Sequence, residues 1–144
     1  MPLDGSKLGE AALPYVENLA IMARSEVVLF QAVAPLDDIM LVAGQQEGMG
    51  SYASNVCCVA AGYVEGLRDG LAAKGILVRT EVHEGHPAES IVDFANREGI
   101  DLIAMSTHGR SGIRRWVFGS IADKVLHAAD IPVLLIRASG GANE

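Results

Sequence analysis

The chain has 144 residues, half of them hydrophobic and one fifth charged, which predicts a single folded domain over residues 1–144 and excludes a disordered chain. Its formal net charge of −7 argues against binding to nucleic acid or to an anionic membrane, and no stretch is apolar and long enough to span a membrane. The adjacent cysteines Cys57 and Cys58 cannot form a disulfide framework, which favours a cytoplasmic location.

The first part of the chain predicts a helix followed by a buried strand. Apolar residues recur at helical spacing after Ser6, although Pro14 favours a kink or a later helix start. Residues 27–33 are rich in β-branched side chains and predict a strand buried on both faces. Residues 34–50 contain one proline, three glycines and two aspartates and predict a long loop. The apolar face of this first helix is expected to contain Leu8, Ala12, Tyr15, Leu19 and Met22.

The second part of the chain alternates helices and strands. A helix is predicted over residues 51–74, and Gly62, Gly66 and Gly70 follow one edge of it. This glycine spacing favours close packing against a neighbouring element, with self-association as the alternative. The apolar face of this helix is expected to contain Val56, Val59, Ala60, Tyr63, Leu67 and Leu71. Strands are expected at residues 78–83, 102–105 and 133–136, with helices from Pro87 to Gly99 and over residues 120–128.

This alternation predicts an α/β fold with an open parallel sheet and helices on both faces. Ligands bind such sheets at the carboxyl ends of the strands, so the loops that follow strands are the candidate sites. The loop from Ser106 leads into the helix at residue 120. Gly109 and Gly112 allow tight turns, and Gly119-Ser120 precedes a helix amino terminus, which attracts anions. Arg110, Arg114 and Arg115 add positive charge, although a solvated basic loop would have the same composition.

Several motifs of the chain resemble the universal stress protein family over its whole length. The segment Pro2-Leu3-Asp4-Gly5-Ser6 resembles the family's proline-x-aspartate-x-serine step, and Gly85-His86-Pro87 its glycine-x-proline step. Nucleotide-binding members show glycine, two residues, glycine, nine residues, then glycine-serine or glycine-threonine. Gly109 and Gly119-Ser120 match the last two parts of this pattern, whereas Ser106 replaces the first glycine. Residues 129–137 resemble the family's final strand.

The resemblance implies a flavodoxin-like, Rossmann-like fold with strand order 3-2-1-4-5 and a cytoplasmic stress-response protein that binds ATP and Mg²⁺. It implies a homodimer through the last strand, formed by Val133, Leu134, Leu135 and Ile136. Asp4 would face the ribose or the metal, and Ala32 and Met105 would border the adenine. The remaining nucleotide-binding residues are expected to be Ser106, His108, Gly109, Arg110, Gly112, Gly119, Ser120 and Ile121, with the arginine added on electrostatic grounds.

The first strand departs from the family's pattern, because only Met1 precedes Pro2. Either the printed chain is truncated relative to a longer one, or Met1 to Leu3 forms a stub whose gap is filled by neighbours or a partner chain. No base and nucleophile can be paired, so we expect a regulatory protein rather than an enzyme, with slow hydrolysis left open. A dimeric interaction module of the same family that binds no nucleotide is the alternative.

Overall fold

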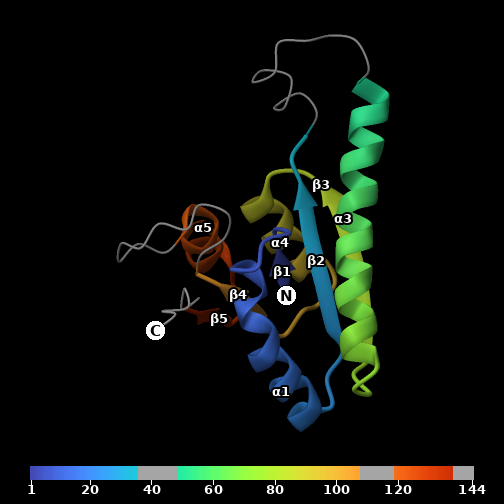
Figure 1. Cartoon of the computed structure of the whole chain (residues 1–144). Helices are drawn as coiled ribbons and strands as arrows, with labels where there is room; N and C mark the ends of the chain where they lie inside the picture. Colours follow the sequence, from blue (N-terminus) through green and yellow to red (C-terminus); the bar gives the residue numbers. More distant parts are fainter. Residues whose placement is uncertain (36–48, 108–118, 138–144) are drawn as a thin grey trace, which may run out of the picture.

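The computed structural model of the chain describes residues 1–35, 49–107 and 119–137, and for residues 49–54 it describes the backbone only. The elements alternate along these residues as the sequence predicts (Figure 1). The strands are β1 (Pro2–Leu3), β2 (Val27–Val33), β3 (Val78–Glu84), β4 (Ile103–Ser106) and β5 (Val133–Ile136). The helices are η1 (Gly9–Ala12), α1 (Leu13–Ala23), α3 (Met49–Ala72), α4 (Pro87–Arg97) and α5 (Ser120–Ala128).

All strand pairs of the described residues are parallel. Backbone hydrogen bonds join β3, β2 and β1 in that order and join β4 to β5 separately. Strand β1 also lies against β4, and Leu3 and Ala104 belong to one apolar cluster. The predicted parallel α/β fold is therefore confirmed. The strands follow the expected order 3-2-1-4-5, but no ladder of hydrogen bonds joins β1 to β4. Strand β1 has only two residues, which limits its pairing with β4.

The short β1 is held at its amino end by Met1. The Met1 amine donates to the carbonyl oxygen of Val28 at 2.7 Å, and the Phe30 N–H donates to the Met1 carbonyl at 3.0 Å. Pro2 and Leu3 continue the ladder opposite Phe30 and Gln31. Burial of the amine lowers its pKa from 8.0 to about 5, because the charged form loses its hydration. Strand β1 is thus a two-residue strand whose preceding residue, Met1, also pairs with β2.

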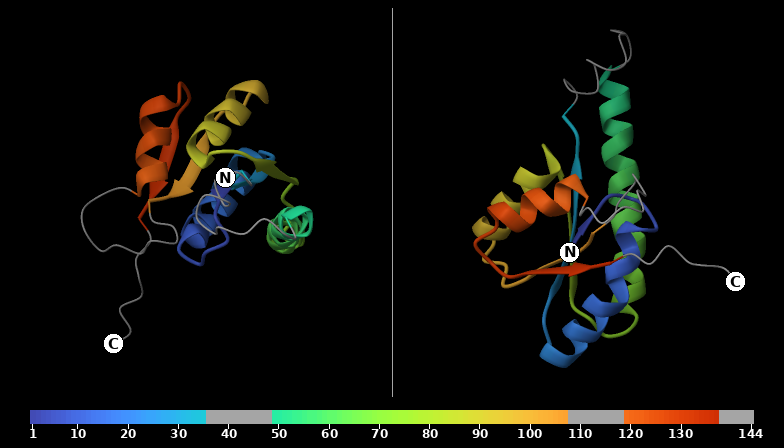
Figure 2. Two further views of the ribbon diagram at one scale, coloured as in Figure 1. Left: turned by 90° about the horizontal axis from the view of Figure 1, so that it is seen from above. Right: turned by 90° about the vertical axis from the view of Figure 1, so that its left-hand side faces the viewer.

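Helices cover both faces of the strands, as predicted. Helices α1 and α3 pack on one face around Leu29 and Val64, which are almost fully buried. Helices α4 and α5 pack on the other face around Phe30, Phe94 and Val125. Figure 2 shows the two helix pairs on opposite sides of the strands when the molecule is seen from above. Because β2 alternates its side chains between the two clusters, it is buried on both faces.

Helix α1 begins later than the first apolar residue predicts and turns a different face to the core. Pro14 lies in its first turn, where proline costs no hydrogen bond, so the later start is the correct alternative. Val16 and Ala20 are buried, whereas the predicted core residues Tyr15, Leu19 and Met22 are exposed. The buried edge passes through Ala12, Val16 and Ala20 at four-residue spacing, so the predicted face was wrong.

Helix α3 does not use its glycines for close packing. A Cβ atom placed on Gly62, Gly66 or Gly70 would meet no atom within 4 Å among the described residues. Val59, predicted for the apolar face, is 67% exposed. The close-packing interpretation is therefore wrong, because these glycines lie on the outer surface of α3. No helix of the described residues is long and apolar enough to cross a membrane.

Candidate functional site

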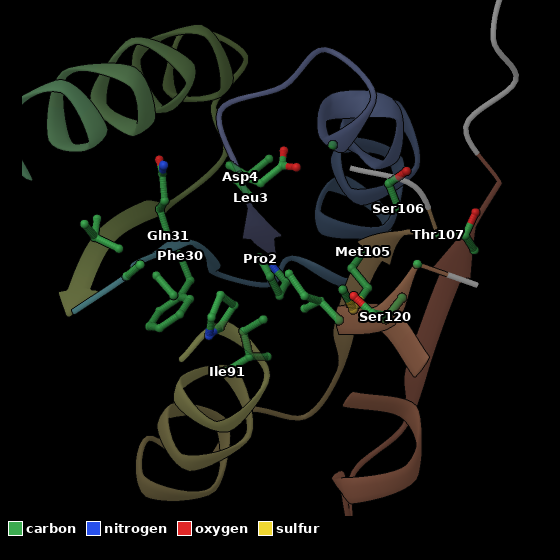
Figure 3. Close-up of a pocket in the computed structure, with 18 of the residues that line it drawn as sticks. Pro2, Leu3, Asp4, Phe30, Gln31, Ile91, Met105, Ser106, Thr107 and Ser120 are labelled. Atoms are coloured by element: carbon green, nitrogen blue, oxygen red, sulfur yellow. The ribbon is translucent and has the colours of Figure 1, made fainter. Parts of the chain in front are cut away.

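A cavity of about 590 Å³ opens where the carboxyl ends of β1, β2 and β4 meet the amino ends of α4 and α5 (Figure 3). This is the edge of the sheet at which parallel α/β folds bind ligands. Its volume falls within the range of about 300–1,000 Å³ typical of small-molecule sites. The lining residues include Leu3, Asp4, Gly9, Phe30, Gln31, Ala32, Val56, Pro87, Ile91, Met105, Ser106, Thr107, Gly119, Ser120, Ile121 and Ala122.

The predicted site residues that the structure describes all line this cavity. They come from four separate parts of the chain: Asp4, Ala32, the pair Met105 and Ser106, and the run Gly119, Ser120 and Ile121. The predicted residues His108, Gly109, Arg110 and Gly112 lie outside the described residues. The structure therefore brings segments together that are distant in the sequence, while the role of each side chain stays a prediction.

The amino end of α5 faces the cavity without a side-chain cap. Gly119 is the N-cap residue, and no described side chain accepts a hydrogen bond there. Its N–H donates to the Thr107 carbonyl oxygen at 2.7 Å, and a Cβ atom at this position would lie 2.9 Å from that oxygen. Glycine is therefore required for the close approach of α5 to the end of β4. The first N–H groups of a helix carry partial positive charge, so this end can accept an anion.

A turn after β1 fixes the carboxylate of Asp4 beside the cavity. Asp4 Oδ1 accepts hydrogen bonds from the Ser6 N–H at 3.0 Å and from the Ser6 hydroxyl at 2.6 Å. The Ser6 Oγ in turn accepts from the Gly9 N–H at 3.0 Å. Gly5 has a φ of 79°, a conformation that glycine adopts without strain. A Cβ atom on Gly9 would lie 2.5 Å from Asp4 Oδ1, so both glycines are needed for this compact turn.

The turn is anchored to α3 through Glu10. Tyr63 donates its hydroxyl to Glu10 Oε1 at 3.3 Å, and Lys7 Nζ lies 2.9 Å from Glu10 Oε2. Burial raises the pKa of the Tyr63 phenol, and the Glu10 carboxylate raises it further by repelling the phenolate. The neutral phenol therefore persists above the usual range and stays available as a donor. This contact links the Asp4 turn to the long helix beside it.

The rest of the described wall is mostly apolar. Asp4 is the one ionisable side chain among the described lining residues, and these residues contain no group of three potential metal ligands. Ile121, expected among the nucleotide-binding residues, is 38% exposed and borders the cavity. Apolar walls with a few polar groups suit a flat organic ligand that carries one anionic end.

Sequence reasoning missed Gln31, a polar residue of the wall that comes from β2. Its side chain is 8% exposed, and its Oε1 is buried without a hydrogen-bond partner among the described residues. The available signal was a single amide in the otherwise apolar run of β2. Thr107, Pro87 and Ile91 also line the cavity and were not predicted, because they approach it from elements whose position depends on packing.

The fold and cavity define a parallel α/β domain with an open cavity at the carboxyl edge of its strands. A family model described as "Universal stress protein family" matches residues 1–137. The chain therefore belongs to the universal stress protein family.

Two relatives from Methanocaldococcus jannaschii illustrate the similarity. Universal stress protein MJ0577 is 26% identical over 148 aligned positions, which span 94% of this chain and 91% of that protein. Universal stress protein MJ0531 is 43% identical over 63 residues, which span 44% of this chain but only 37% of that protein. A solved structure of MJ0577 matches with a TM-score of 0.84, covering 97% of this chain and 94% of that chain.

Two more distant solved structures share the fold and contain nucleotides. A universal stress protein in complex with cAMP matches at 20% identity with a TM-score of 0.63, covering 96% of this chain and 94% of that one. A family member from Arabidopsis thaliana with AMP bound matches at 14% identity with a TM-score of 0.65, covering 92% and 80%. At these identities the likeness concerns the fold.

Proposed function

We propose that the chain binds an adenine nucleotide, ATP, in the cavity at the carboxyl edge of β1, β2 and β4. The observation that carries the proposal is the convergence of every described candidate residue on this one cavity, with the uncapped amino end of α5 at its rim. Family members with bound cAMP and AMP support the class of ligand. The cavity volume and its apolar wall suit a purine nucleotide.

Each part of the nucleotide has a matching part of the wall. The phosphates would take the N–H groups at Ser120 and Ile121, where the helix dipole favours negative charge. The ribose would lie near Asp4, whose carboxylate accepts hydrogen bonds from hydroxyls. The purine would lie against the apolar side chains of Ala32 and Met105.

Magnesium is compatible with this arrangement. Mg²⁺ is commonly held by one or two carboxylates together with substrate phosphates and water, rather than by a protein cage. Asp4 supplies one carboxylate at the cavity, and its orientation is fixed through the Ser6 hydrogen bonds. The residue would contribute an oxygen ligand while the nucleotide supplies the others.

We further propose a cytoplasmic homodimer that regulates through binding rather than catalysis. Strand β5 bonds to β4 through the Pro132 and Ile136 carbonyls. Successive residues of a strand alternate direction, so the backbone groups of Val133 and Leu135 point to the opposite edge. That edge has no partner strand among the described residues, and its apolar side chains are only partly buried. A second copy pairing there would cover it.

Isothermal titration calorimetry with Mg-ATP at up to millimolar concentration tests the nucleotide site, and light scattering on the same sample measures the oligomeric state. We expect saturable heat, a rise of the melting temperature and a dimer mass. A dimer that gives neither heat nor a thermal shift would contradict nucleotide binding and favour an interaction module. A monomer that binds ATP would contradict only the proposed dimer.

A further inference from the structure

Among the described residues of the cavity wall, Gln31 carries a buried side-chain oxygen, Oε1, that the fold leaves without a hydrogen-bond partner. Its side chain is more than nine-tenths buried, and Oε1 has no hydrogen-bond partner among the described residues. An unsatisfied buried polar atom costs about 1–3 kcal/mol. An apolar side chain of similar size would avoid this cost, so the amide is destabilising unless something from outside the fold pairs with it.

The position of Gln31 directs its amide at the ligand space. Gln31 lies opposite Leu3 in the β1–β2 register, and Leu3 belongs to the cluster beneath α1 and α3. Figure 3 shows the amide on the side of the strands where the Asp4 carboxylate lies, away from Phe30 and Ile91. Its neighbours in the cavity wall on this side include Val33 and Val56, which offer no polar side-chain atom.

We propose that Gln31 determines the base specificity of the adenine nucleotide site, on whose existence this inference rests. The amide oxygen accepts a hydrogen bond from the 6-amino group of the purine. The amide N–H group can donate to a neighbouring ring nitrogen, so one carboxamide matches the donor and acceptor on an adenine edge. A purine that lacks the amino group leaves Oε1 buried and unpaired.

The order of the strands places Gln31 at the base end of the nucleotide. The amino end of α5, where phosphates are expected, follows β4, whereas Asp4 follows β1 and Gln31 lies on β2. Strand β1 lies against β4 and is hydrogen-bonded to β2, so the strands follow one another in the order β4, β1, β2. Phosphate, ribose and base follow the same order along a nucleotide. Gln31 therefore lies two strands from the phosphate end, and the side chain of its neighbour Ala32 borders the same cavity from the opposite face of β2.

Binding measurements that combine two nucleotides with wild type and a variant test this role of Gln31. Wild type and Gln31→Leu are each titrated with ATP and with purine ribonucleoside 5′-triphosphate, which lacks only the 6-amino group. Leucine keeps the bulk of the side chain and removes its hydrogen bonds, and Gln31→Met serves as a second variant should leucine pack poorly. Val33→Ala is the matched control, because it changes the same wall on the same face without removing a polar group.

We expect wild type and Val33→Ala to bind ATP about tenfold more tightly than the analogue, and Gln31→Leu to bind both equally. Without nucleotide, Gln31→Leu should melt at the same or a higher temperature. The proposed role of Gln31 is wrong if Gln31→Leu and Gln31→Met keep the tenfold preference, or if wild type binds ATP and the analogue equally. If wild type binds neither nucleotide, the proposed function itself fails and the role of Gln31 with it.

Discussion

Polar groups near the two ends of β1 differ in whether they have hydrogen-bond partners. At the amino end, the Met1 amine and carbonyl are both paired with β2, inside an apolar cluster. At the carboxyl end, Gln31 Oε1 has no hydrogen-bond partner among the described residues, and α5 begins without a side-chain cap. Buried polar atoms are normally satisfied, so an unpaired oxygen in the cavity wall supports the proposed ligand site at this end. The amino end of β1 is thus stabilised by hydrogen bonds within the fold, whereas the carboxyl end borders the cavity.

The largest expected effect concerns the amino end. Burial lowers the pKa of the Met1 amine to about 5, whereas the unfolded amine titrates near 8.0. Between these pH values the unfolded chain binds more protons, so the free energy of unfolding should rise as the pH increases from 5 to 8. A shift of this size corresponds to at most about 4 kcal/mol. Urea denaturation at several pH values measures the slope.

The matched control is a chain extended by a few residues before Met1. The extension replaces the amine with an amide N–H that donates to Val28 and carries no titrating charge. Its free energy of unfolding should be less dependent on pH in the same window. An unchanged slope would show that the amine is not the titrating group.

At the carboxyl end, Gly119→Val should weaken Mg-ATP binding about hundredfold, equal to about 2.7 kcal/mol and near the top of the range for overpacking. The new side chain meets the Thr107 carbonyl oxygen, where a Cβ alone would lie 2.9 Å away, and pushes the amino end of α5 from the cavity. Gly66→Val is the control, because that site is open. Calorimetry should show weakened binding of Mg-ATP, and light scattering should show that the dimer is intact. If Gly119→Val binds Mg-ATP with wild-type affinity, the amino end of α5 is not part of the binding site.

Local sequence patterns predicted the elements whose ends depend on one or two residues. Strand β2 matches residues 27–33, and Pro87 starts α4 because proline needs no N–H partner in a first turn. The glycine-serine step likewise predicted the start of α5. These boundaries follow from backbone chemistry, which neighbours in the sequence determine.

Faces and partners were predicted less well, because they depend on packing between distant segments. The spacing of Tyr15 and Leu19 indicates a helix but cannot show which face of the helix packs on the strands. The sequence likewise shows Gln31 as a polar residue in an apolar strand, but only the folded wall shows that its Oε1 is buried without a partner among the described residues. The candidate site was therefore predictable as a set of loops and not as a set of contacts.

A smaller effect is expected from Ser6→Ala, which tests whether the Asp4 turn is preorganised. The variant removes the hydroxyl that donates to Asp4 Oδ1 and leaves the Gly9 N–H without its acceptor. The free energy of unfolding should fall by about 1.5 kcal/mol. Ser25→Ala is the control, because Ser25 is exposed and only its backbone N–H is bonded. Equal denaturation midpoints for the two variants would contradict a structural role for the Ser6 hydroxyl.

The smallest effect is expected from Tyr63→Phe, which removes the 3.3 Å hydrogen bond to Glu10. At pH 7 the loss should be about 0.5–1 kcal/mol, because the phenol is half-buried and the bond is long. The pKa of the folded phenol is raised, so the unfolded chain loses this proton first and wild type should be progressively destabilised above pH 10. Tyr63→Phe should lack that part of the alkaline destabilisation, whereas the exposed control Tyr15→Phe should keep it.

Denaturant titrations at pH 7 and pH 10.5 compare wild type, Tyr63→Phe and Tyr15→Phe. If Tyr63→Phe is destabilised by alkali as much as wild type, folding does not raise the pKa of the Tyr63 phenol. The hydrogen bond between α3 and the Asp4 turn would then contribute no stability.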